Sequence, residues 1–231
     1  MQNRQNIFIT GGNRGIGRGL VKELYQNHNV IFSVRSEQIG IETVENFHNK
    51  NVKFVVMDVD NSNGVKKAVD KLKKLVDSID ILFNNAGILI NGLQNDNALL
   101  ATNEESILKT FNTNTLGVLR VTKYLVPLMP HGSRIINLSS GMGQLDDMQG
   151  GHAAYRLSKT ALNALTVILS KELDRKNIRV NSICPGWVQT DMGGPSATLT
   201  VEESTKKIVK FSLGNDFPNG KFLRHGQIIP W

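Results

Sequence analysis

Short apolar runs alternate with helical patterns along this chain, and that alternation restricts its fold more than any other feature. Apolar runs predict strands at residues 6–9, 30–34, 52–57, 79–84, 134–139 and 178–183. Patterns with helical spacing predict helices at residues 39–48, 64–76, 104–129 and 153–176. Near-continuous apolar strands separated by helices are typical of a parallel sheet that is covered on both faces. We therefore expect an α/β fold, with residues 1–231 forming one domain around a single doubly wound parallel sheet.

A glycine-rich turn follows the first apolar run and leads into an amphipathic run at residues 20–25. Glycines allow the backbone to turn tightly and to approach a pyrophosphate, and a helix N-terminus offers free N–H groups and positive potential. A bare glycine triplet could be a simple turn, but its place at the first strand-to-helix junction favours a phosphate-binding cradle. The residues assigned to this cradle are Gly11, Asn13, Arg14, Gly15, Ile16 and Gly17.

Composition argues against several other classes of function. The net charge is +7, but the lysines at residues 66–74 alternate with apolar residues as on a solvated helix face, so we expect no nucleic-acid partner. The single cysteine, Cys184, fits a reducing compartment, and no cluster of Cys and His predicts a metal site. Residues 1–5 lack the apolar core of a signal peptide, and the apolar segment 161–169 is too short to span a bilayer. We expect a cytoplasmic protein without a membrane segment.

A tyrosine and a lysine lie four residues apart in the last long helical pattern, at Tyr155 and Lys159. On a helix, residues with this spacing share one face, so phenol and ammonium can act at one site. A free tyrosine has a pKa of about 10, and a nearby cation favours the phenolate. The spacing also occurs by chance in ordinary helices, so the pair needs support from other motifs.

That support comes from motifs that follow the predicted strands, which together resemble the short-chain dehydrogenase/reductase family over almost the whole chain. The motifs are Asp58, Asn84-Asn85-Ala86-Gly87, Asn114, Ser140, Tyr155, Lys159 and Pro185-Gly186-Trp187-Val188-Gln189-Thr190. Within the family, segments 154–159, 187–194 and 219–231 are similar to a carbonyl-reductase-like subgroup that contains sniffer and C-factor.

The resemblance implies a Rossmann fold and a set of contacts to a nicotinamide cofactor. Asp58 and the backbone of Val59 would hold the adenine, and Thr190 would bind the nicotinamide carboxamide. Beyond the glycine turn, the residues that the resemblance assigns to the cofactor are Asp58, Val59, Asn85, Ala86, Gly87, Tyr155, Lys159, Pro185, Gly186, Val188 and Thr190.

The resemblance also implies the chemistry: Tyr155 would protonate a carbonyl oxygen as hydride reaches its carbon, and Ser140 would donate a hydrogen bond to that oxygen. Lys159 would lower the pKa of Tyr155 and contact the nicotinamide ribose. Asn114 would hold a water that links Lys159 to solvent. The family pattern places the catalytic serine at Ser140, with Ser139 as the alternative.

The end of the second predicted strand decides which cofactor we expect. An acidic residue there would bind the ribose 2′-hydroxyl of NAD, but this chain has Arg35. Arg14 in the glycine turn is a second cation, and a guanidinium matches a phosphate with a planar fork of donors. Either arginine alone could be an ordinary surface residue, but together they favour NADP(H).

The sequence leaves the substrate and the assembly open. Residues expected to wall the substrate pocket are mostly apolar, which favours an uncharged small-molecule carbonyl: Leu89, Met142, Gln144, Trp187 and the segment 192–199. Glycines in that segment suggest a mobile lid. The resemblance implies a homodimer or homotetramer, although Ala161, Leu165 and Ile168 could equally belong to the core. The alternative function is a dinucleotide-binding signalling protein with weak or incidental catalysis.

Overall fold

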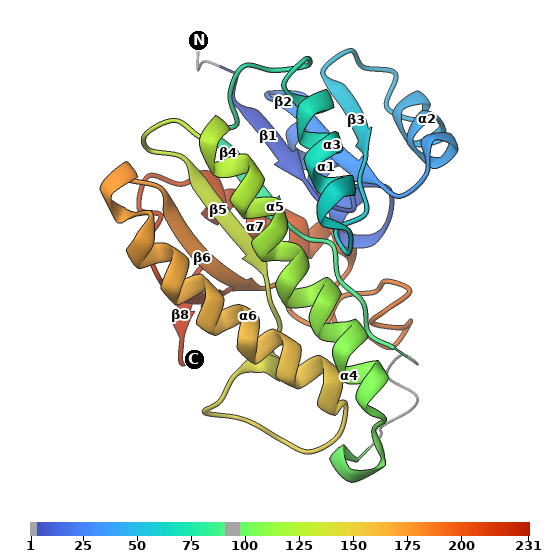
Figure 1. Cartoon of the computed structure of the whole chain (residues 1–231), viewed down its shortest axis with the longest axis vertical. Coiled ribbons are helices and arrows are strands. Elements are labelled where there is room, and N and C mark those ends of the chain that lie inside the picture. The colour runs from blue at the N-terminus through green and yellow to red at the C-terminus, as the bar shows by residue number, and fades with distance from the viewer. Residues whose placement is uncertain (1–3, 91–97) are drawn as a thin grey trace.

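A computed structural model describes residues 4–90 and 98–231 of the chain. Residues 1–3, which belong to the segment 1–5 that we expect not to be a signal peptide, lie outside the described residues. The strands are β1 (Asn6–Ile9), β2 (Asn29–Val34), β3 (Val52–Val56), β4 (Ile81–Asn84), β5 (Arg134–Leu138), β6 (Arg179–Cys184), β7 (Phe222–Arg224) and β8 (Gln227–Ile229). They form one sheet in the order β3-β2-β1-β4-β5-β6-β7-β8 (Figure 1). Strands β1 to β7 pair in parallel, and β8 pairs antiparallel with β7.

Helices cover both faces of this sheet. They are α1 (Gly15–Leu24), α2 (Glu37–Glu45), α3 (Ser62–Leu72), α4 (Glu104–Phe111), α5 (Gly117–Leu125), α6 (Ala153–Glu172) and α7 (Val201–Leu213). One apolar cluster joins the sheet to α3, α5 and α6, which cross its front in Figure 1. A second cluster packs α1 and α7 on the opposite face. The predicted doubly wound α/β fold is therefore confirmed, and strand burial on both faces explains its apolar runs.

The predicted helix at residues 104–129 is not one α-helix. A π-helical segment, Asn112–Leu116, separates α4 from α5, and a 3-10 turn, Val126–Leu128, follows. Asn114 lies in the π segment, where its Oδ1 accepts from Ile88 N at 2.8 Å and its Nδ2 donates to Ile88 O at 2.9 Å. Wide turns of this kind occur often at functional sites. The irregularity presents the Asn114 side chain to the loop that follows β4.

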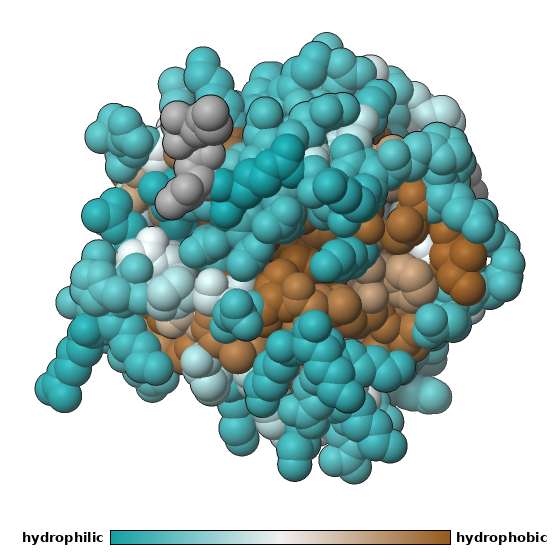
Figure 2. Space-filling view, turned by 90° about the horizontal axis from the view of Figure 1, so that it is seen from above, coloured by the Kyte–Doolittle hydropathy of each residue, from teal (hydrophilic) through white to brown (hydrophobic). Residues whose placement is uncertain are grey.

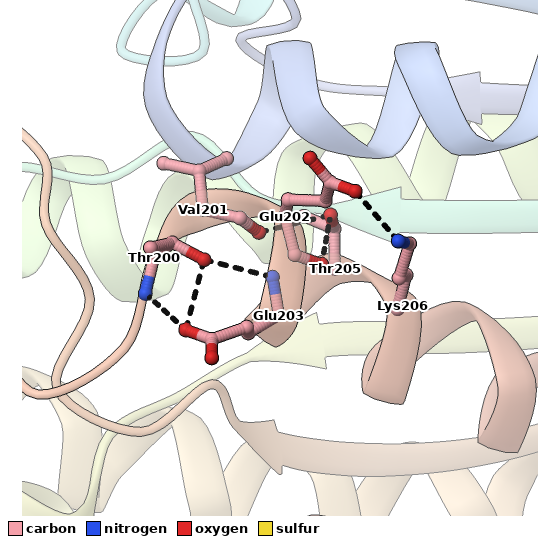
Figure 3. A network of polar contacts seen from close by, with 6 residues as sticks. All are labelled: Thr200, Val201, Glu202, Glu203, Thr205 and Lys206. Carbon is pink, nitrogen blue, oxygen red and sulfur yellow. Dashed lines mark hydrogen bonds and ion pairs between the residues drawn. The ribbon is translucent and has the colours of Figure 1, made fainter.

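Helix α7 and the β7–β8 hairpin were missing from the sequence-based prediction. Figure 3 shows how α7 begins: Thr200 Oγ1 accepts from Glu203 N at 3.1 Å, and the Glu203 carboxylate accepts from Thr200 N at 2.8 Å. This reciprocal arrangement is a capping box, which stabilises a helix N-terminus. Lys206 and Glu202 add an exposed ion pair one turn later.

A chain of buried polar side chains crosses the centre of the sheet and reaches α6. Asn84 on β4 donates to Asn137 on β5 at 2.9 Å, and Asn137 donates to Thr166 on α6 at 2.8 Å. Thr166 in turn is hydrogen-bonded to Ser182 on β6 at 2.8 Å. Because buried polar groups need partners, these contacts fix the orientation of α6 on the sheet. Helix α6 carries Tyr155 and Lys159, so the network helps to position both.

The surface carries most of the charge. Figure 2 shows apolar residues gathered in the middle of one face, with hydrophilic side chains around them. Of the described helices, none is both long and apolar enough to cross a membrane. The described residues also contain no group of three or more His, Cys, Asp or Glu side chains arranged for a metal ion.

Candidate active site

A cavity of about 290 Å³ lies at the carboxyl edge of the sheet, where ligands bind in open α/β folds. It is lined by residues that follow the ends of β1, β2, β3, β4 and β6. The sequence-predicted residues in its lining are Gly11, Asn13, Arg14, Gly15, Ile16, Gly17, Arg35, Asp58, Val59, Asn85, Ala86, Gly87 and Thr190. The structure therefore brings the motifs after five different strands into one cleft.

The glycine turn has the backbone shape that a phosphate cradle requires. Gly11 and Gly15 have φ values of +70° and +51°, which side chains with a Cβ rarely adopt. A Cβ on Gly17 would lie 2.0 Å from the carbonyl oxygen of Gly11, so α1 can approach the turn only because this position is glycine. Asn85 closes the other side by donating its Nδ2 to Gly11 O at 3.1 Å and to Thr10 O at 2.9 Å. The turn, the helix N-terminus and the cleft together fit a dinucleotide.

Two arginines reach this cleft from different elements. Arg35 is exposed directly after β2, and Arg14 precedes α1. Arg14 Nη1 lies 2.6 Å from the carboxylate of Asp191, which follows Thr190 and also lines the cavity. Both arginines expected to bind a 2′-phosphate are therefore at the cleft, but one of them is already paired.

Several cavity residues were not found from the sequence. They are Ser33, Val34, Ile39, Met57, Asp60, Ile88, Lys109, Thr113 and Asp191. Met192 also lines this cavity, although the sequence analysis placed it at the substrate pocket. Thr113 Oγ1 donates to Asp60 at 2.9 Å, so the π-helical segment Asn112–Leu116 is tied to the loop after β3. For Asp60 and Asp191, a sequence signal was available, because each is a polar residue directly beside a predicted motif. Lys109 and Thr113 gave none, because helical position alone does not reveal what a side chain faces.

Ser140, rather than Ser139, meets Tyr155. The side chains of Ser140 and Tyr155 are hydrogen-bonded, whereas Ser139 Oγ donates to Asn163 Oδ1 at 2.7 Å in the interior. A tight contact explains this geometry: a Cβ on Gly143 would lie 2.6 Å from the Lys159 carbonyl carbon. The turn after Ser140 therefore packs directly on the backbone of α6.

Lys159 and Asn114 lie next to this pair and close to the cleft. Lys159 Nζ donates to Leu138 O at 2.8 Å and lies 5.6 Å from the centre of the Tyr155 ring. A Cβ on Gly87, which lines the cleft, would be 3.1 Å from Asn114 Oδ1 and 3.6 Å from Lys159 Nζ. Ser140, Tyr155, Lys159 and Asn114 do not line the cavity themselves. They lie beyond its Gly87 end.

The net pKa of Tyr155 in the chain by itself is raised, not lowered as we expected from the neighbouring Lys159. Burial raises the pKa of the Tyr155 phenol to about 12, and its hydrogen bond to Ser140 offsets only part of that effect. Burial also lowers the pKa of the Lys159 ammonium to about 8. Desolvation disfavours both charged forms, so the phenol keeps its proton at neutral pH.

The segment after β6 agrees only partly with the sequence-based assignment. Thr190 lines the cavity, but Pro185, Gly186 and Val188 do not. Trp187 is 47% exposed, and its indole N–H donates to Gly193 O at 2.8 Å. Gln189 N donates to Leu199 O at 2.8 Å, which fastens the last residue of the expected lid, segment 192–199, to a residue just before its start. Met142 lies in the turn after Ser140, and Gln144 is buried at its end.

Known proteins match this chain along most of its length. The family model described as short chain dehydrogenase matches residues 5–198. Carbonyl reductase (NADPH) 1 of Mus musculus is 28% identical, with 99% of each chain covered. The C-signal protein of Myxococcus xanthus is 38% identical over 66% of this chain and 93% of its own. The solved structure of carbonyl reductase Sniffer of D. melanogaster superimposes with a TM-score of 0.89, at 34% identity, covering 99% of this chain and 100% of that one.

Proposed function

Because this chain belongs to the short-chain dehydrogenase family, we propose that it is an NADPH-dependent oxidoreductase that reduces a carbonyl group to an alcohol. The observation that carries the proposal is the hydrogen-bonded pair of Tyr155 and Ser140 beyond the Gly87 end of the cleft. The mouse relative named for NADPH and carbonyl reduction supports both the cofactor and the reaction class.

The cleft would hold NADPH through residues that the chain supplies from several loops. Gly11, Gly15 and Gly17 leave room for the pyrophosphate, and Arg14 and Arg35 would bind the 2′-phosphate. When bound, NADPH would supply the hydride for the carbonyl carbon of the substrate. Asp58 and Val59 would contact the adenine, and Thr190 the nicotinamide, as predicted from the sequence.

Tyr155 supplies the proton that completes the reduction. Its raised pKa keeps the phenol protonated at neutral pH, which is the form that a general acid needs. An alkoxide is a much stronger base than a phenolate, so the proton moves from Tyr155 to the substrate oxygen as negative charge develops there. Ser140 donates a hydrogen bond to the same oxygen. The buried phenol therefore favours reduction over alcohol oxidation near pH 7.

Lys159 and Asn114 would support this acid. The Lys159 ammonium lies over the Tyr155 ring and stabilises the phenolate that remains after proton transfer. With a pKa of about 8, Lys159 is also able to return a proton. Asn114 anchors the neighbouring Ile88 backbone, from where a water would connect Lys159 with solvent.

The remaining assignments are also proposals. We propose an uncharged aldehyde or ketone as substrate, since Met142 and Trp187 offer apolar walls. We propose a homodimer or homotetramer in the cytoplasm: Leu157 and Ile168 on α6 are 48% and 53% exposed, while Leu165 packs into the core. Sedimentation of the purified chain tests the assembly.

NADPH oxidation with a panel of aldehydes, ketones and quinones tests the function. We expect turnover by the wild type, a loss of about 10²–10⁴-fold in kcat for Tyr155→Phe, and an NADPH Kd changed less than about threefold. Tyr25→Phe, directly after α1 and away from Ser140, is the matched control and should retain activity. No turnover above the Tyr155→Phe background with any carbonyl would contradict the enzyme proposal.

A second function is favoured by the match to the C-signal protein: NADPH-dependent signalling with weak or incidental catalysis. It predicts tight NADPH binding by a chain that turns over no carbonyl in the same panel. The contact of Ser140 with Tyr155, and the position of Lys159 over the Tyr155 ring, favour the enzyme.

A further inference from the structure

An ion pair crosses the mouth of the cofactor cleft. Arg14, just before α1, and Asp191, just after Thr190, are 177 residues apart in sequence, yet Arg14 Nη1 lies 2.6 Å from Asp191 Oδ2. Both residues line the cavity. Their side chains are 64% and 78% exposed, so the pair lies at the solvent side of the cleft.

The carboxylate of Asp191 is unexpected in a cleft that would receive a polyanion. A negative charge there repels the phosphates of a nucleotide unless a cation neutralises it. Arg14 provides that cation, but exposed ion pairs are weak and exchange readily. A phosphate dianion is a strong competitor, because it can accept two parallel hydrogen bonds from one guanidinium.

The other arginine at the cavity is not engaged in this way. Within the described residues, Arg35 has no ion-pair partner, and it lines the same cavity from the end of β2. The cleft therefore offers one guanidinium without an ion-pair partner among the described residues and one that is held by Asp191. Two parallel hydrogen bonds from the Nη1–Nη2 edge of Arg14 to a 2′-phosphate require Nη1 to leave Asp191.

We propose that Asp191 sets how strongly the chain prefers NADPH over NADH, by competing with the 2′-phosphate for Arg14. This inference rests on the proposed NADPH-dependent function. When Arg14 must first leave Asp191, the apparent affinity for the 2′-phosphate equals the intrinsic affinity multiplied by the fraction of molecules in which Arg14 is free. For an exposed ion pair, that fraction is about one half to one sixth. Asp191 would thus weaken NADPH binding about two- to six-fold and leave NADH binding nearly unchanged.

Cofactor binding without substrate tests the proposal. The Kd values of NADPH and NADH would be measured by fluorescence titration for the wild type, Asp191→Asn, Arg14→Gln and the double variant. We expect Asp191→Asn to tighten NADPH binding about two- to six-fold and to change the NADH Kd by less than about 1.5-fold. In the Arg14→Gln background, Asp191→Asn should leave the NADPH-to-NADH ratio of Kd values unchanged.

Three outcomes would overturn the proposal. Weaker NADPH binding by Asp191→Asn would mean that the pair clasps the bound cofactor instead of competing with it. Equal tightening for both cofactors, or a ratio that still shifts without Arg14, would mean that Asp191 acts through general repulsion of anions. Absence of NADPH binding to the wild type would contradict the proposed function itself, so the two failures are distinguishable.

Discussion

Gly17→Ala places a methyl group at the closest approach between the glycine turn and α1. The added Cβ would lie 2.0 Å from Gly11 O and 2.6 Å from Asn85 Nδ2. The first contact is with backbone and cannot be relieved by a rotamer change. The second displaces the amide that donates to Thr10 O and Gly11 O, so both hydrogen bonds weaken.

The expected loss of stability is the balance of three effects. Overpacking costs about 1–3 kcal/mol, and two weakened hydrogen bonds cost about 1–2 kcal/mol together. Alanine gains about 1 kcal/mol over glycine in a helix, and Gly17 is in α1. The free energy of unfolding should therefore fall by about 1–4 kcal/mol, which lowers Tm by roughly 2–16 °C in a chain of this size.

Urea unfolding and NADPH titration measure the two consequences. Because the turn is displaced, we expect the NADPH Kd of Gly17→Ala to rise by more than about tenfold. Gly150→Ala is the matched control: nothing lies within 4 Å of its added Cβ, so both quantities should stay near the wild type. An unchanged free energy of unfolding and an unchanged NADPH Kd for Gly17→Ala would refute the packing argument.

Three further predictions follow from the site and its support. Ser140→Ala should lower kcat about 10²–10³-fold with NADPH binding retained, whereas Ser139→Ala should mainly reduce stability, because Asn163 loses a buried donor; steady-state kinetics and urea unfolding separate these effects. Between pH 8 and 10 the unfolded chain keeps a proton on Lys159 that the folded chain has lost, so the free energy of unfolding should rise with pH by up to about 3 kcal/mol, and Lys159→Met should lack that rise. Asn137→Leu removes partners from two buried side chains and should cost about 2–3 kcal/mol in urea unfolding; a loss below about 0.5 kcal/mol would contradict the network.

The strands were predictable because burial on both sheet faces demands apolar runs. The π segment at Asn112–Leu116 was not, since it accompanies hydrogen bonds between Asn114 and the distant Ile88 backbone. Strands β7 and β8 have three residues each and exist only through pairing, which a local pattern does not reveal. Helix α7 was missed although Thr200 and Glu203 form the spacing of a capping box.

The residues of the candidate site can also be divided into those that the sequence predicts and those that only the fold brings together. Residues within the glycine turn and directly after β4 could be assigned, because they belong to short motifs at strand ends. The Arg14–Asp191 pair and the contact of Thr113 with Asp60 join distant segments, so only the fold brings them together. The rise in the pKa of Tyr155 was not predicted, because depth of burial is a tertiary property.

Transfer of a labelled hydride tests the central claim most directly. The wild type would be incubated with 4-nitrobenzaldehyde and NADPH that carries deuterium at both C4 positions, and the product analysed by mass spectrometry. We predict an alcohol with one deuterium at the carbinol carbon, and a loss of its formation in Tyr155→Phe. An alcohol without deuterium, or no alcohol above the Tyr155→Phe background, would contradict the account.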